Sequence, residues 1–192
     1  MTKQKKERPL STREMILCAL FTALIAAGAF IRIPIPVIPF TLQTLFVMLA
    51  GTILGSKLGA VSSGLYLVLG LVGLPIFTKG GGLFYIVQPT FGYILGFVAG
   101  AWLAGWIVEH ASSPGFKVFL AAGLACLAMV YLLGTIYYYC IIRFYLGQSI
   151  AIGTLLLYCF LTTISGDLVL CVLSAVLSRR VRPWAKQNTL LA

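Results

Sequence analysis

Long, uninterrupted apolar runs are the feature that most constrains this chain. The stretch VFLAAGLACLAMVYLLGTIYYY, residues 118–139, contains no charged side chain and no regular alternation of apolar and polar residues. A transmembrane helix needs about 20 apolar residues, whereas the strands of a membrane barrel alternate over about ten. Because lipid offers no hydrogen-bonding partners, the backbone of such a run must satisfy itself as a helix. The sequence therefore predicts an all-α integral membrane protein.

The composition of the whole chain agrees with this prediction. The chain has 192 residues, of which 60% are hydrophobic and 9% are charged. A soluble domain carries about 25% charged residues, so a soluble fold is excluded. After tails and loops, the remaining length accommodates about six spans. The first apolar run lacks a small-residue cleavage pattern, and we expect it to be a retained span instead of a signal peptide.

Proline and glycine divide the chain into these six spans. Ser11 or Thr12 can cap the first helix, which the proline-rich segment 34–39 ends. Pro75 ends the third span, and Pro89 is expected in the first turn of the fourth. The apolar segment 144–166 is expected to dip back against the bundle, partly helical, without crossing. The expected spans cover about residues 11–33, 41–55, 58–74, 89–110, 116–143 and 166–179.

The basic residues are distributed unequally between the expected loops. With a cytoplasmic N-terminus, eleven of them lie inside and three lie outside, which predicts that both termini are cytoplasmic. The net charge of +10 then lies mainly at juxtamembrane ends, which indicates contact with anionic lipid and not with nucleic acid. We expect one membrane domain over residues 1–192, with a basic tail (1–10), a six-helix bundle (11–183) and a second cytoplasmic tail (184–192). The outer set is Arg32, Lys79 and Arg143, and the inner set is Lys3, Lys5, Lys6, Arg8, Arg13, Lys57, Lys117, Arg179, Arg180, Arg182 and Lys186.

Asp167 is the acid with the most unusual surroundings. It lies in the apolar stretch TTISGDLVLCVL, and only four acids occur in the chain. The 12 residues that separate it from Arg179 correspond to roughly 18 Å of helix, which places it in the outer half of the membrane. An ionisable group at that depth is a candidate ligand-binding residue. The alternative is that the carboxylate only complements the helix dipole near a helix start.

A polar, glycine-rich segment, FTKGGGLFYIVQPTFGY, supplies most of the other candidates. Lys79 can pair with a ligand carboxylate, with Arg32 as a rival cation, and the following glycines allow close backbone approach. A mostly apolar pocket with a few polar groups is the usual design of a small-molecule site. The candidate substrate-binding residues are Asp167, Lys79, Gln88, Tyr93, Gln43, Thr41, Phe40, Gly82, Tyr85 and Thr90.

Enzymatic motifs are absent from the sequence. It contains one histidine and shows no zinc-binding HExxH pair, no GxSxG nucleophile motif and no phosphate-binding loop. We therefore expect no enzyme activity, no metal and no cofactor, and energy for any transport must come from a partner. The five cysteines show no paired spacing, so we interpret them as small buried hydrophobic residues.

The first span carries small residues at four-residue spacing. Ala19, Ala23 and Ala27 form one stripe on its surface, where another helix can approach closely. This stripe predicts either an interface with a partner helix or packing within the bundle itself.

Four stretches resemble the BioY family, the biotin-capturing S components of energy-coupling factor (ECF) transporters. They are PIPVIPFTLQTLFVMLAG, YLVLGLVGLPIFTKGGG, QPTFGYILGF and SGDLVL, and the similarity covers about residues 13 to 180. The resemblance implies a six-helix S component with its ligand site near the outer face. It implies that Asp167 accepts hydrogen bonds from the ureido group of biotin, and that Lys79 or the glycine-loop amides meet the biotin carboxylate. Gln43, Gln88 and Tyr93 then add polar contacts.

The resemblance also implies partners and a location. The alanine stripe would dock on the ECF transmembrane coupling subunit, which carries two cytoplasmic ATPase subunits, in a multi-pass protein of the cell membrane. The chain departs from the family pattern at Leu170, where a lysine is common, and at Gln88 and Phe91, where glycines are common. Other interpretations are a stand-alone facilitator, or an S component for a different vitamin or a biotin precursor.

Overall fold

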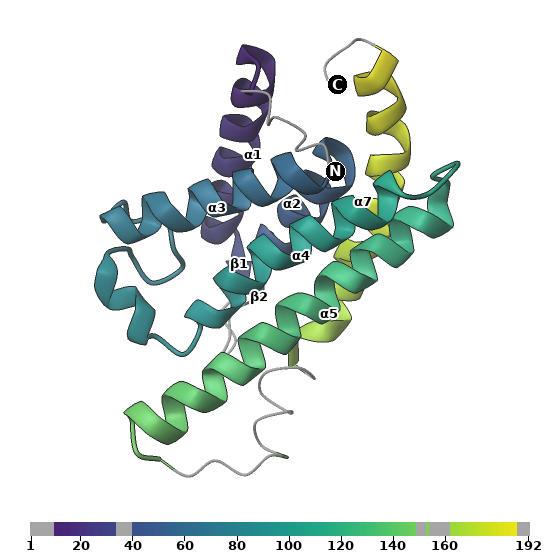
Figure 1. Cartoon of the computed structure of the whole chain (residues 1–192). Coiled ribbons are helices and arrows are strands. Elements are labelled where there is room, and N and C mark those ends of the chain that lie inside the picture. Colours follow the sequence, from purple (N-terminus) through teal and green to yellow (C-terminus); the bar gives the residue numbers. More distant parts are fainter. Residues whose placement is uncertain (1–9, 34–39, 149–152, 154–161, 188–192) are drawn as a thin grey trace, which may run out of the picture.

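The protein is described by a computed structural model that covers residues 10–33, 40–148, 153 and 162–187. Helices make up nearly all of the regular structure in these residues (Figure 1). The sequence predicts six main helices, and the described part of the chain contains six α-helices. They are α1 (Thr12–Phe30), α2 (Gln43–Leu49), α3 (Ser56–Val72), α4 (Phe91–Glu109), α5 (Phe116–Cys140) and α7 (Thr162–Gln187). Two π-helical turns, Ala50–Leu54 and Ile141–Tyr145, continue α2 and α5.

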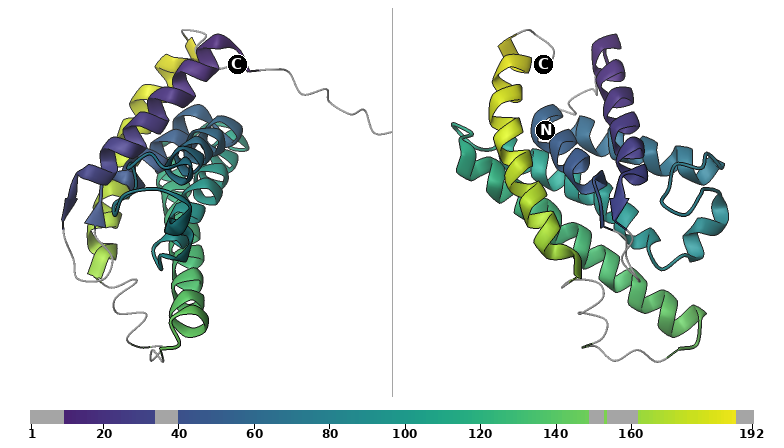
Figure 2. Two further views of the ribbon diagram at one scale, coloured as in Figure 1. Left: turned by 90° about the vertical axis from the view of Figure 1, so that its left-hand side faces the viewer. Right: turned by 180° about the vertical axis from the view of Figure 1, so that it is seen from behind.

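The helices lie in two groups with the apolar core between them. Helices α1 and α7 lie on one side of the molecule, and α3, α4 and α5 lie on the other (Figure 2, left). Helix α2 packs against α1, α4 and α7, and so joins the two groups. The first turn of α1 and the last turn of α7 lie at the same end of the molecule, as two termini on one side of a membrane require (Figure 1). That this side is cytoplasmic stays a prediction from the charge count.

The start of α1 confirms the predicted cap, whereas its end differs from the prediction. Ser11 Oγ accepts from Glu14 N at 3.3 Å, and Glu14 Oε2 accepts from Ser11 N at 2.6 Å, which forms a capping box. The helix ends at Phe30, three residues before the expected end of the span. The reason is that Arg32–Ile33 (β1) pairs in an antiparallel manner with Phe40–Thr41 (β2). This strand pair brings the start of α2 next to the end of α1.

The segment between α3 and α4 is more ordered than its sequence suggests. Helix α3 ends at Val72, and Gly73 follows in the left-handed conformation with φ 118°, two residues before the expected terminator Pro75. A 3-10 helix, Leu83–Val87, then lies inside the expected loop. Helix α4 begins only after this turn, at Phe91. The prediction that Pro89 belongs to the first turn of α4 is therefore wrong.

Small residues allow α4 and α5 to pack closely. Gly92, Gly96 and Gly100 lie four residues apart on the face of α4 that contacts α5. A Cβ atom added to Gly96 would lie 2.7 Å from the Cα atom of Val130, which is closer than real Cβ contacts allow. The backbones of the two helices can meet only because these side chains are absent. This pair forms the wall that carries Tyr93 and Tyr131.

Helix α7 is longer than the sixth span predicted from the sequence. It begins at Thr162 and continues to Gln187, past Arg179, so the first residues of the expected C-terminal tail are helical. The segment expected to dip back into the bundle lies mostly outside the described residues. By length and composition, three of the described helices qualify as membrane spans: Thr12–Phe30, Phe91–Glu109 and Phe116–Tyr145. Shorter apolar helices cover Gln43–Leu54 and Ser56–Val72.

The described cysteines are free thiols, and three of the four are buried as the sequence predicts. Cys140 is the exception and is exposed near the end of α5, whereas Cys159 lies outside the described residues. No group of three or more His, Cys, Asp or Glu side chains gathers into a metal site within the described part of the chain.

Candidate functional site

A cavity lies where β2, α2, α3, α4, α5 and α7 meet the glycine-rich loop, which is the segment 73–90 between α3 and α4. It contains about 610 Å³ of space free of protein atoms, part of which is open to the surroundings. The lining residues are Phe40, Thr41, Gln43, Thr44, Tyr66, Thr78, Tyr85, Thr90, Tyr93, Ile94, Phe97, Val130, Tyr131, Thr163 and Asp167.

Asp167 is the charged side chain of this lining. Its side chain is only 6% exposed, and the first turn of α7 contains no acidic residue. The carboxylate is therefore not placed to cap the helix, and that alternative interpretation of Asp167 loses its geometric basis. A buried carboxylate needs hydrogen-bond donors, and here the hydroxyls of Tyr131 and Thr44 supply them.

Tyr131 of α5 holds the Asp167 carboxylate in position. The Tyr131 hydroxyl donates to Asp167 Oδ2 at 2.5 Å, and the Tyr131 and Thr163 hydroxyl oxygens lie 2.7 Å apart. Because the hydrogen of Tyr131 is used on Asp167, the Thr163 hydroxyl must donate to Tyr131. This chain of bonds fixes one carboxylate oxygen. A carboxylate has about four acceptor positions, so the group retains capacity for donors of a ligand.

Gln43 links three elements around the cavity. Its Nε2 donates to the Tyr66 hydroxyl at 2.6 Å, and that hydroxyl donates to the Ile76 carbonyl at 3.1 Å. Its Oε1 accepts from the Thr41 hydroxyl at 3.4 Å. The amide of Gln43 therefore joins β2, α3 and the glycine-rich loop. Gln43 therefore borders the cavity as a structural link, and its NH₂ group keeps one hydrogen beyond the bond to Tyr66.

The glycine-rich loop forms one wall and is held by several contacts. The Arg32 guanidinium donates to the Thr78 carbonyl, and the hydroxyls of Thr78 and Tyr85 lie 3.1 Å apart. Phe77 is buried, and its ring centroid lies 5.3 Å from that of Tyr66 in an edge-on arrangement. The rival cation Arg32 thus binds the loop itself. Its position ties the first outer strand to the residue next to Lys79.

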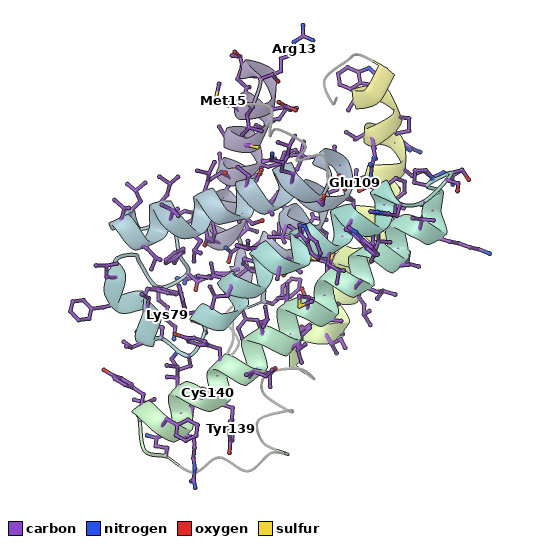
Figure 3. The ribbon with its side chains drawn as sticks, in the orientation of Figure 1. Arg13, Met15, Lys79, Glu109, Tyr139 and Cys140 are labelled. Carbon is purple, nitrogen blue, oxygen red and sulfur yellow. The ribbon has the colours of Figure 1, made fainter. Side chains whose placement is uncertain are left out.

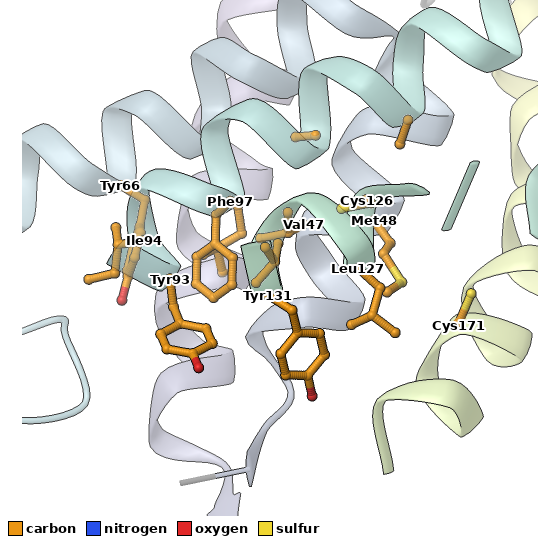
Figure 4. Close-up of a cluster of buried hydrophobic side chains, with 14 of the residues drawn as sticks. Val47, Met48, Tyr66, Tyr93, Ile94, Phe97, Cys126, Leu127, Tyr131 and Cys171 are labelled. Carbon is orange, nitrogen blue, oxygen red and sulfur yellow. The ribbon is translucent and has the colours of Figure 1, made fainter. Parts of the chain in front are cut away.

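The rest of the cavity wall is apolar and aromatic. Figure 4 shows Tyr66, Tyr93 and Tyr131 with their hydroxyl groups turned toward one side of the apolar cluster. The ring centroids of Tyr93 and Tyr131 lie 6.2 Å apart in an edge-on arrangement. The Thr90 hydroxyl is buried and has no partner within the described part of the chain. An unpartnered buried hydroxyl at a cavity wall is suited to bind a polar group of a ligand.

The structure gathers seven of the ten candidate residues around this cavity. They are Phe40, Thr41, Gln43, Tyr85, Thr90, Tyr93 and Asp167. Lys79, Gln88 and Gly82 do not line it. Lys79 is exposed on the loop next to the lining residue Thr78, remote from Glu109 at the other end of the molecule (Figure 3). Gly82 borders a separate, apolar groove together with Phe84. The roles of Lys79, Gln88 and Gly82 therefore stay predictions.

Sequence reasoning missed the residues that come from the middle of helices. Tyr66, Phe97, Val130 and Tyr131 line the cavity, although each lies within a continuous apolar helix. Their hydroxyls or rings face inward only because of how α3, α4 and α5 pack. Thr163 lies one turn before Asp167 on the same helix face, and that four-residue spacing is the one signal in the sequence that predicts it.

Leu170, which stands where the resemblance leads us to expect a lysine, is part of the apolar core. Its side chain is 6% exposed and packs with Cys18, Phe21 and Leu45 in an apolar cluster between α7, α1 and α2. It does not line the cavity, although it lies only three residues after Asp167. In this chain the position three residues after Asp167 is therefore part of the apolar core and supplies no charge beside the carboxylate.

Comparison with known proteins explains this architecture. The family model of the BioY family matches residues 1–187. The chain belongs to the BioY family. The "Probable biotin transporter BioY" of Lysinibacillus sphaericus is 41% identical over 171 residues, which cover 89% of this chain and 87% of that protein. The "Biotin transporter BioY" of Thermotoga maritima is 37% identical over 174 residues, covering 88% and 96%.

A solved structure extends the similarity to three dimensions. It is the crystal structure of the S component for biotin from an ECF-type ABC transporter, which is 30% identical in sequence to this chain. The two structures agree with a TM-score of 0.78, and the match covers 95% of each chain. The six-helix S-component fold implied by the sequence motifs is thereby confirmed, and the protein is a multi-pass membrane protein.

Proposed function

We propose that this protein captures biotin at the outer face of the cell membrane, as the substrate-binding subunit of an ECF transporter. One observation carries the proposal: a buried carboxylate, Asp167, borders a cavity lined by aromatic and threonine side chains within an S-component fold. The names of the relatives and of the solved structure supply the ligand. We infer a capture role in transport and no catalytic reaction.

The chemistry of biotin fits this lining. Biotin presents two ureido N–H donors, a ureido carbonyl, an apolar sulfur-containing ring and a carboxylate on a flexible chain. In our proposal Asp167 accepts from the ureido N–H groups, and Thr90 and Tyr93 supply further polar contacts. The aromatic rings of Phe40 and Tyr85 cover the apolar ring. The carboxylate meets Lys79 or the backbone amides of the glycine-rich loop at the cavity edge.

The partners are proposed from the ECF context and from the surface of α1. Ala19, Ala23 and Ala27 are all exposed, so the stripe does not serve packing within the bundle. A flat stripe of small residues on a membrane-facing helix suits close approach of another helix. We infer that it contacts the transmembrane coupling subunit, which in turn carries two cytoplasmic ATPases. Lipid covers the remaining outer surface of the bundle.

Isothermal titration of the detergent-purified protein with biotin tests the ligand. We expect saturable binding with one site per chain, and its absence at micromolar biotin would refute the proposal. Competition with dethiobiotin and with unrelated vitamins separates biotin from a precursor or another vitamin. Uptake in cells that lack the ATPases separates a dependent subunit from a stand-alone facilitator, because only the facilitator would continue to transport.

A further inference from the structure

A second groove lies at the opposite end of α4 from the cavity, between the end of α4 and the start of α5. It contains about 640 Å³ of space free of protein atoms and is open along its length. Its apolar wall consists of Ile107 from α4 with Val118 and Ala121 from α5. Its rim is formed by Trp106, His110 and Lys117. The groove therefore combines an apolar strip with a polar, basic margin.

The geometry of the rim leaves two nitrogen groups available. His110 Nδ1 lies 2.9 Å from the Trp106 carbonyl oxygen, and the two rings stack with centroids 4.5 Å apart. A carbonyl oxygen only accepts, so Nδ1 carries a hydrogen, and the outer nitrogen, Nε2, donates to a further acceptor when the imidazole carries both hydrogens. Lys117 is exposed and forms no hydrogen bond or ion pair with any residue that the structure describes.

The charge around the rim is positive because the neighbouring acid is used elsewhere. Glu109 accepts from Ser56 N at 2.8 Å and from Ser56 Oγ at 2.6 Å, which places its charge at the start of α3 and away from the groove. The N-cap residue of α5, Gly115, provides no side-chain cap. The first N–H groups of this helix thus add a partial positive charge beside Lys117.

We propose that this groove binds one anionic phospholipid. Its phosphate accepts from the Lys117 ammonium and from the Nε2–H group of the doubly protonated His110, and an acyl chain lies along Ile107, Val118 and Ala121. Basic pockets between transmembrane helices bind anionic head groups, and tryptophan is enriched at the level of the head groups. Trp106 lies in the last turn of α4, next to the polar residues Glu109 and His110 that end the helix. A free phosphate would not explain the apolar strip that continues from the rim.

Fluorescence quenching by brominated lipids tests the proposal directly. Trp102→Phe and Trp184→Phe leave Trp106 as the reporter in the full chain, because the protein has three tryptophans. In lipid nanodiscs, brominated phosphatidylglycerol added as a minor component should quench Trp106 more strongly than the same fraction of brominated phosphatidylcholine. Lys117→Gln should reduce this preference about fivefold, since one lysine near an anionic surface contributes about 1 kcal/mol. Adding His110→Gln to Lys117→Gln should reduce the preference for phosphatidylglycerol further.

Lys57→Gln is the matched control, because it removes an exposed lysine from the start of α3, outside the groove. This variant should keep the full preference, and unchanged thermal unfolding in detergent should show that each variant is folded. Equal quenching by both lipids in the single-tryptophan protein would overturn the proposal. A preference that survives the combined change of Lys117 and His110 would also overturn it. If neither brominated lipid quenches Trp106 and the protein forms cross-linked dimers, the groove would be assigned to a second copy of the chain and lipid binding would be refuted.

Discussion

Replacing Asp167 by asparagine tests the centre of the proposed site with little change in shape. In the structure the Tyr131 hydroxyl donates to Asp167 Oδ2 at 2.5 Å. An asparagine has one acceptor oxygen and one NH₂ donor in place of two acceptor oxygens. If its oxygen turns toward Tyr131, the NH₂ group faces the ureido N–H donors of biotin. If the oxygen turns toward biotin, the NH₂ group faces Tyr131.

Either orientation leaves a donor without its acceptor, and the size of the effect follows from this. A hydrogen bond to a charged group contributes about 1.5–3 kcal/mol, and the site is too buried for water to replace it fully. We therefore expect Asp167→Asn to weaken biotin binding roughly ten- to a hundredfold. Titration calorimetry in detergent measures the dissociation constant, and thermal unfolding of the same sample shows whether the variant is folded.

Tyr131→Phe completes a double-mutant cycle. Alone, it removes the donor that orients Asp167, and it should weaken biotin binding about threefold to tenfold. In this background Asp167→Asn should cost less than in the wild type, because the asparagine NH₂ group no longer meets a hydroxyl. We expect a coupling of about 1 kcal/mol between the two changes. Unchanged biotin affinity in a folded Asp167→Asn protein would refute the assignment of Asp167 to the ligand.

Three further predictions concern assembly and packing. Ala23→Trp should leave biotin binding intact but abolish assembly with the coupling subunit, as measured by co-purification, and normal assembly would contradict the proposed interface. Glu109→Ala should destabilise the protein by about 1 kcal/mol, because Ser56 at the start of α3 loses both bonds, and thermal unfolding in detergent should show it. Gly105→Ala should cost about 1–3 kcal/mol, since the new Cβ would lie 2.2 Å from Ser56 N, whereas Gly64→Ala, in open space within α3, should stabilise the protein by up to about 1 kcal/mol.

The sequence by itself determined the class of protein and most helix positions. In a membrane the backbone must bond to itself, so long apolar runs leave helices as the solution, and proline and glycine mark their ends. The cap of the first helix at Ser11 was predicted for the same local reason. The sequence also singled out Asp167, because a lone acid in an apolar run is costly unless it has a partner.

Two predicted helix ends were wrong because the segment next to each helix forms a structure of its own. The first helix ends early because β1 pairs with β2, and Pro89 lies before α4 because a 3-10 helix occupies the preceding segment. Neither the strand pair nor the 3-10 helix can be recognised from the residues at the helix end itself. Lys79 was selected for its charge beside the glycines; the structure places it on the exposed edge of the loop, outside the cavity lining, and its role stays a prediction.

The tertiary structure alone decided which uncharged residues make the site. Tyr131 and Phe97 look like ordinary members of apolar helices, and their position at the cavity depends on the rotation of each helix about its axis. That rotation is set by close packing, such as the contact of Gly96 with Val130, and not by hydrophobic periodicity, since nearly all faces of these helices are apolar. The sequence thus predicted that Asp167 needs a partner, and the packing of α5 against α7 supplied Tyr131.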